Sequence, residues 1–136
     1  DQFFEAYFEL RTAVGEKNRE RVEKALGQIE SMGIEHPDVT LLKINHVSMI
    51  RGMEEQAWDM ARQLYETDGE NKGARYWYAR AALDVEEMPV EPEELEQVIA
   101  GLLEEEPENP GFWQMRRVLK KAEPSGAGFG GFSQGL

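Results

Sequence analysis

The chain has 136 residues, no cysteine and a formal net charge of -12. A chain of this length can bury one hydrophobic core, and the absence of cysteine excludes disulfides, thiolate metal sites and thiol nucleophiles. Because nucleic-acid affinity depends largely on Lys and Arg placed at phosphates, the acidic balance argues against DNA or RNA as a partner.

Apolar residues recur at intervals of three and four positions almost throughout, and no segment shows the alternation of a half-buried strand. This periodicity predicts an all-α fold of about seven helices. In chain order, the predicted helices cover residues 3–14, 22–32, 37–50, 53–67, 72–87, 92–103 and 110–122. Glycines end the first three, at Gly15, Gly33 and Gly52, and Pro92 and Pro110 open the last two.

These helices form one predicted domain over residues 1–122. Residues 123–136 contain Gly and Phe and are too rich in glycine to hold a helix, so we expect a flexible C-terminal tail. No apolar run approaches the roughly 20 residues of a membrane-spanning helix, so we expect no direct membrane insertion of this chain. The sequence begins with Asp1 rather than Met, which suggests a processed product or an excised fragment. The compartment stays open: cytoplasmic, or periplasmic or extracellular if a signal or anchor was removed.

Turn signals recur along the chain at a period near 34 residues, at Pro37-Asp38, at residues 69–71 and at residues 107–110. Twelve residues before each of them lie Ala25, Ala57 and Leu95, and small residues at such places let helices cross closely. This pattern resembles the tetratricopeptide repeat (TPR), a family of stacked helix-turn-helix units. Leu95 departs from the small residue of the family pattern, and about four extra residues lie near Pro89.

The resemblance implies antiparallel helix pairs wound into a right-handed superhelix, with the first helix of each pair lining a concave groove. On that basis six residues are expected to face a protein or peptide ligand: Leu42, His46, Met49, Tyr76, Arg80 and Leu83. Such a groove suits hydrophobic anchors and a carboxylate. Trp77 is expected to pack between helices instead.

The sequence therefore predicts a noncatalytic adaptor that binds a protein or peptide segment. The alternative is a structural or self-association module of a larger complex, including a membrane-anchored one, that uses the terminal helices as homo-oligomer contacts. No cofactor, metal site or catalytic constellation is recognisable, because His36 and His46 do not share a helix face and the carboxylates are too numerous to single out a pair. His36, beside a turn, is interpreted as a solvated or capping residue.

The segment 86–108 contains ten Glu and no Lys or Arg. Charge of one sign at this density can steer a basic partner toward the surface that carries it. The same pattern also fits an ordinary solvated helix face, since Glu forms helices well and favours helix starts. Both interpretations remain open from the sequence.

Overall fold

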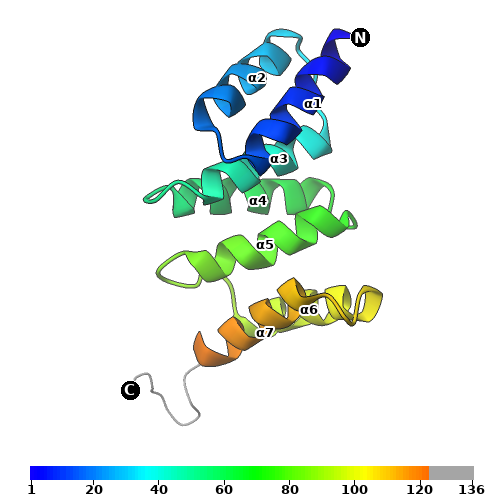
Figure 1. Ribbon diagram of the computed structural model, residues 1–136. Helices are drawn as coiled ribbons and strands as arrows, with labels where there is room; N and C mark the ends of the chain where they lie inside the picture. The colour runs from blue at the N-terminus through cyan, green and yellow to red at the C-terminus, as the bar shows by residue number, and fades with distance from the viewer. Residues whose placement is uncertain (123–136) are drawn as a thin grey trace.

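The computed structural model describes residues 1–122, and this part of the chain is all-α, without strands. The predicted tail lies outside the described residues. Seven helices follow one another from one end of the molecule to the other (Figure 1). Their bounds are α1 Gln2–Gly15, α2 Arg19–Ser31, α3 Pro37–Ser48, α4 Glu54–Thr67, α5 Lys72–Asp84, α6 Pro92–Glu105 and α7 Pro110–Ala122. None of these helices combines the length and apolarity that a membrane crossing requires.

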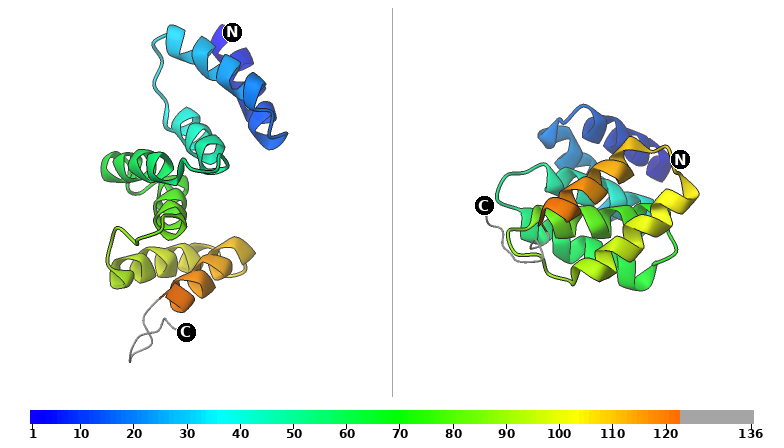
Figure 2. Two further views of the ribbon diagram at one scale, coloured as in Figure 1. Left: turned by 90° about the vertical axis from the view of Figure 1, so that its left-hand side faces the viewer. Right: turned by 90° about the horizontal axis from the view of Figure 1, so that it is seen from below.

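The helices contact one another in a regular order. α1 packs on α2, α3 on α4, α4 on α5 and α5 on α6, and α7 rests on both α5 and α6. The odd-numbered helices also form a continuous row, since α1 contacts α3, α3 contacts α5 and α5 contacts α7. Within residues 1–122 the even-numbered helices α2, α4 and α6 make no contact with each other. The left-hand view of Figure 2 shows the same progression from the N-terminal to the C-terminal helices.

The equivalent places of the predicted repeat are buried, and two of them hold alanine and one holds leucine. Ala25, Ala57 and Leu95, the three positions that share a place in the predicted repeat, are 0%, 2% and 0% exposed. On α5, Ala74 and Ala81 are also fully or almost fully buried. Because alanine adds little side-chain bulk, the helix axes can approach closely there. Trp77 is buried among residues of α3 and α4, as predicted.

Helix caps account for most of the predicted boundaries. His36 is the N-cap of α3, where its Nδ1 accepts a hydrogen bond of 3.1 Å from Asp38 N–H, so the interpretation of His36 as a capping residue is confirmed. Gly33 and Gly52 have φ of 69° and 91°, in the left-handed region that glycine tolerates best. After α1, however, the left-handed residue is Lys17 at φ 57°, and Gly15 remains helical.

The end of α5 differs from the sequence prediction. The helix stops at Asp84 rather than at residue 87, and Val85 has extended backbone. Pro89 explains this, because proline has no N–H and its ring disfavours a helical conformation of the preceding residue. Met88 and Val90 then pack against the core of α5, α6 and α7.

Two of the turns repeat the same side-chain arrangement. Asn71 Oδ1 accepts from Gly73 N–H at 2.8 Å, and its Nδ2 donates to Asp68 at 3.0 Å. Asn109 does the same before α7, accepting from Gly111 N–H at 2.9 Å and donating to Glu106 at 3.0 Å. One turn therefore recurs after α4 and after α6.

Candidate functional site

A groove of about 340 Å³ lies between α5 and α7. Both helices belong to the row of odd-numbered helices, and the groove follows their line of contact. Its lining residues are Tyr76, Arg80, Leu83, Asp84, Gly111, Gln114, Met115 and Val118. The groove therefore contains three of the six residues that the sequence assigned to a ligand surface.

Arg80 is the exposed cation of this groove, and its position is fixed by its neighbours. Its Nη1 donates a hydrogen bond of 2.8 Å to the hydroxyl of Tyr76. The guanidinium carbon lies 4.9 Å from the ring centroid of Trp77 and 5.9 Å from that of Tyr76, a cation–π arrangement. Among residues 1–122, Arg80 forms no ion pair. Its remaining N–H donors can therefore bind a carboxylate in the bidentate geometry typical of arginine.

The rest of the groove is mainly apolar. Leu83 is partly buried, Met115 is almost fully buried and Val118 is 37% exposed. Methionine adapts its shape easily, which suits a surface that accepts side chains of different outline. An aliphatic or aromatic anchor of a ligand can thus contact these residues while its polar end reaches Arg80.

Asp84 completes the rim next to Arg80. Desolvation at this position raises the pKa of the Asp84 carboxyl, whereas the positive charge of Arg80 opposes that rise. The two charges are close enough to influence each other without forming a salt bridge. An incoming carboxylate therefore meets one cation and one anion, which favours a ligand whose acidic group approaches from the Arg80 side.

The three predicted residues of α3 lie elsewhere. Leu42 packs against the core between α1 and α2, and His46 is only 7% exposed, with its Nε2 4.0 Å from a carboxylate oxygen of Glu23 on α2. Met49 is 42% exposed at the end of α3. None of the three lines the α5–α7 groove. The structure thus brings together Tyr76, Arg80 and Leu83, and directs Leu42 and His46 toward the first helix pair.

Burial dominates the chemistry of His46. Desolvation lowers its pKa, and the nearby charge of Arg19 acts in the same direction, whereas Glu23 raises it. Within residues 1–122 its Nε2 is buried without a hydrogen-bond partner. The imidazole is therefore a neutral packing residue at neutral pH.

The sequence prediction did not include the residues of α7 that line the groove, although the repeat pattern of the sequence indicates two of them. Tyr76 and Arg80 follow the capping Asn71 by the same intervals at which Gln114 and Val118 follow Asn109. The positions of α7 that are equivalent to Tyr76 and Arg80 in the repeat are therefore Gln114 and Val118, and both line the groove.

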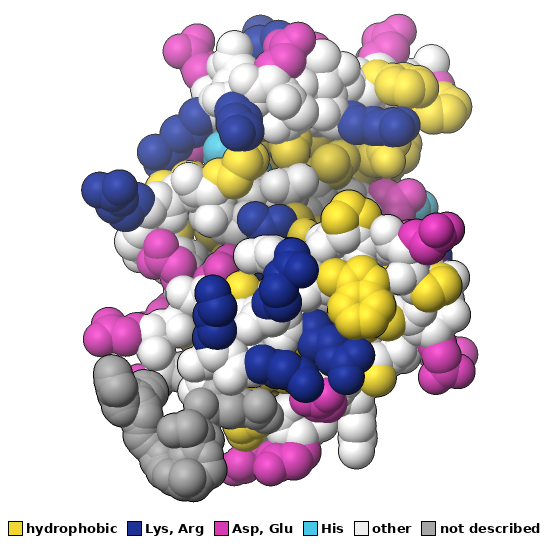
Figure 3. All heavy atoms as spheres, turned by 60° about the horizontal axis from the view of Figure 1, so that its bottom comes forward, with side chains coloured by type: hydrophobic (Ala, Val, Ile, Leu, Met, Phe, Trp, Pro, Cys, Tyr) yellow, Lys and Arg dark blue, Asp and Glu magenta, His cyan; other side chains and the backbone are white. Residues whose placement is uncertain are grey.

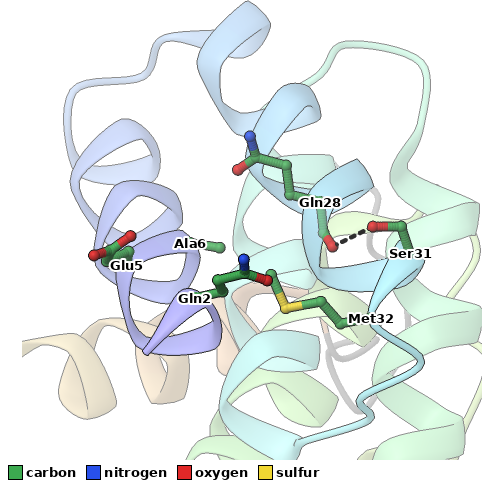
Figure 4. Close-up of a pocket in the computed structure, with 6 residues that line it drawn as sticks. All are labelled: Gln2, Glu5, Ala6, Gln28, Ser31 and Met32. Atoms are coloured by element: carbon green, nitrogen blue, oxygen red, sulfur yellow. Dashed lines mark hydrogen bonds between the residues drawn. The ribbon is translucent and has the colours of Figure 1, made fainter.

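A hollow of about 370 Å³ lies between the start of α1 and the end of α2. Its six lining residues are shown in Figure 4, where Ser31 Oγ donates to the carbonyl of Gln28 at 2.7 Å. Glu5 is its one ionisable residue and lies on the other side of α1 from Gln28 and Ser31. This hollow therefore assembles no acid–base pair. In the described part of the chain, no three His, Asp or Glu side chains are grouped as metal ligands.

Two large aromatic side chains are exposed on α1. Phe4 and Phe8 are 56% and 54% exposed, and their rings stack with centroids 5.3 Å apart. Phe3, in contrast, is partly buried against the α1–α2 core. A stacked, solvent-exposed aromatic pair is a typical protein-contact feature.

Comparisons of this chain with protein-family models, with curated proteins and with solved structures gave no match.

Proposed function

We propose that this chain is a noncatalytic, TPR-like adaptor that binds a protein or peptide segment in the groove between α5 and α7. The ligand carries a hydrophobic side chain, which contacts Leu83 and Val118, and an acidic group, which binds Arg80. Binding buries the apolar wall, and the arginine determines the orientation of the ligand.

The contacts among the helices support the TPR-like interpretation. In a TPR array the first helices of successive pairs line the concave side, and the row formed by α1, α3, α5 and α7 agrees with that order. The repeated Asn turn at Asn71 and Asn109 supports an internal repeat in the second half of the chain. The right-handed superhelix itself is part of the proposal.

The proposed function rests on one observation, which is the environment of the Arg80 guanidinium. An arginine that is exposed, oriented by Tyr76 and Trp77 and without a carboxylate partner within residues 1–122 is prepared for a ligand. An arginine that served only the fold would more commonly pair with one of the many acidic side chains, as Arg75 does with Glu105 at 2.6 Å.

The test is selection of ligands from a random-peptide library on the immobilised protein, followed by affinity measurements on the enriched peptides. We expect enriched sequences that combine a hydrophobic residue with a nearby Asp or Glu. Arg80→Ala should weaken their binding by roughly 10- to 100-fold, since a hydrogen-bonded charge contributes about 1.5–3 kcal/mol.

Arg51→Ala is the matched control, because Arg51 is also an exposed arginine but lies in the turn after α3, away from the groove. It should leave the affinity within about twofold of the wild type. Equal losses for the two variants, or no enrichment of any peptide, would contradict the proposed function.

A second candidate function is assembly through the N-terminal helix, and the exposed Phe4–Phe8 pair favours it. In that case α1 packs against another protein or another copy. Phe4→Ser/Phe8→Ser should then abolish association without reducing helicity, whereas Arg80→Ala should have no effect on it.

A further inference from the structure

A cleft of about 640 Å³ lies between α4 and the connection from α5 to α6. Its apolar residues are Trp58, Val85, Met88 and Pro89, and its charged residues are Glu55, Asp59, Glu86 and Glu87. No Lys or Arg lines it. The cleft therefore combines an apolar surface with four carboxylates from two segments of the chain.

Most of these carboxylates have no counter-charge within residues 1–122. Glu55, Glu86 and Glu87 form no ion pair there, and Asp59 lies 3.8 Å from Arg62, a residue that also bonds Glu66 at 3.1 Å. Like charges held near one another raise the free energy of the folded state. A cationic ligand in the cleft would remove that repulsion.

The irregular connection after α5 creates this arrangement. Because Val85 is extended and Met88 packs against the core, Glu86 and Glu87 are exposed on the surface beside α4. Residues 85–87 follow the end of α5 as bends instead of continuing the helix, and all three line the cleft. The extra residues near Pro89 therefore have a structural consequence, which is the acidic cleft.

The opposite charge is concentrated on α7. This helix contains Arg116, Arg117, Lys120 and Lys121 and no acidic residue, in a chain of net charge -12. Figure 3 shows Lys and Arg side chains gathered around hydrophobic side chains on the face that includes this end of the molecule. Arg117, Lys120 and Lys121 form no ion pair within residues 1–122. Arg116 alone approaches a carboxylate, at 3.7 Å from Glu96.

An exposed tryptophan lies among these charges. Trp113 is 41% exposed, and its ring is held by a hydrogen bond of 2.7 Å from Nε1 to the carbonyl of Pro107 and by Arg116, which lies 5.6 Å from the ring centroid. The outer face of α7 thus presents a fixed aromatic surface with free basic side chains beside it. This is the complement of an apolar cleft bordered by carboxylates.

We propose that α7 of one copy docks into the acidic cleft of a second copy. Within a single copy the basic residues of α7 form no ion pair with Glu55, Asp59, Glu86 or Glu87, so both sets of charges are open to a second copy. The two contact surfaces differ, so the association is head-to-tail and can continue into longer assemblies. The basic residues Arg117 and Lys120, which form the contact, do not themselves line the α5–α7 groove.

The test is sedimentation equilibrium of the full chain at about 50 mM and about 500 mM NaCl, since salt screens exposed charge pairs. We expect association at low salt that weakens at high salt. Glu86→Lys/Glu87→Lys should reduce self-association at least roughly tenfold, and so should Arg117→Glu/Lys120→Glu. Glu20→Lys/Glu104→Lys makes the same charge change as the cleft variant at exposed positions outside both surfaces, and should associate as well as the wild type or better.

Mixing the two charge-reversed variants provides the decisive step. Each alone presents like charges at the contact, whereas the mixture pairs the basic α7 of the cleft variant with the acidic cleft of the α7 variant. Recovery of association in the mixture, with circular dichroism showing each variant folded, supports the proposal. A wild type that stays monomeric at low salt overturns the proposal. Self-association that is unchanged in both charge-reversed variants also overturns it, and so does self-association that is lost only in Phe4→Ser/Phe8→Ser. Peptide affinity measured on the same variants reports separately on the groove.

Discussion

Arg80 Nη1 donates a hydrogen bond of 2.8 Å to the hydroxyl of Tyr76, one helical turn earlier on α5. The bond links the one charged donor of the groove to an aromatic side chain that is itself partly buried against neighbouring helices. It keeps the guanidinium in place without using all of its donors. A pre-positioned side chain loses less conformational freedom when a ligand binds.

Tyr76→Phe tests that role. The variant keeps the ring and removes the hydroxyl, so Arg80 loses its acceptor but keeps both aromatic faces. We expect affinity for a library-selected acidic peptide to fall by roughly 2- to 10-fold, less than for Arg80→Ala, because only the ordering of the arginine is lost. Fluorescence anisotropy with the labelled peptide measures this.

The combined variant Tyr76→Phe/Arg80→Ala is the control. If the hydroxyl acts through Arg80, removing it in the absence of the arginine should have no further effect on affinity. Additive losses in the combined variant would show that the hydroxyl contacts the ligand directly.

Periodicity predicted the all-α fold and the seven helices because apolar spacing and caps act locally. Pro92 and Pro110 open α6 and α7 as expected, and Asn109 caps α7, since the residues that start a helix lie within a few positions of its first turn. The end of α5 was not predicted. It depends on Pro89 and on the packing of Met88 and Val90 against distant helices, and periodicity within one segment contains no such information.

The site was harder to predict than the fold for a related reason. Tyr76, Arg80 and Leu83 lie on the exposed side of α5, and helical spacing groups them. His46 shares a stripe with Leu42 and Met49, but α2 covers part of that stripe, so the imidazole is buried beside Glu23. Spacing identifies the residues of one face, whereas the packing of neighbouring helices determines which part of that face remains open.

The paired Asn turns give a stability prediction. Asn71→Ala and Asn109→Ala each remove the acceptor at a helix N-terminus and the bond to the acid three residues earlier. Each should lower the free energy of unfolding by about 1 kcal/mol in urea denaturation. Asn45→Ala is the control: Asn45 lies within α3 and its side chain forms no hydrogen bond within residues 1–122, so its replacement should be neutral or slightly stabilising. Similar losses at all three positions would contradict the capping role.

His46 predicts a loss of stability in mild acid. Because its pKa is lowered in the folded protein, chiefly by burial, the unfolded chain takes up the proton first as pH falls below the ordinary histidine pKa of about 6.5. The free energy of unfolding should therefore decrease below that pH, by at most about 1.4 kcal/mol per pH unit from this residue. Urea denaturation between roughly pH 7.5 and roughly pH 5 measures the slope.

Two variants separate His46 from the many carboxylates. His46→Leu removes the titrating group and the unpaired buried Nε2, so its stability should depend less on pH and should not fall at neutral pH. Glu23→Gln removes the charge that raises the His46 pKa, so the loss in acid should become larger. An unchanged slope in His46→Leu would mean that carboxylates, rather than this imidazole, control the acid response.

The left-handed residues at the two helix ends of the first pair predict opposite effects for adding and for removing a glycine. Lys17 has φ 57° after α1, and Gly33 has φ 69° after α2. A side chain in this region costs about 1 kcal/mol, which glycine avoids. Lys17→Gly should therefore raise the free energy of unfolding by roughly 0.5–1 kcal/mol, and Gly33→Ala should lower it by about 1 kcal/mol.

No other atom lies within 4 Å of a Cβ added at Gly33, so a loss there reports backbone conformation alone. Thermal and urea denaturation of both variants measure the pair, and a destabilised Lys17→Gly would show that the lysine side chain stabilises this turn by more than its conformation costs.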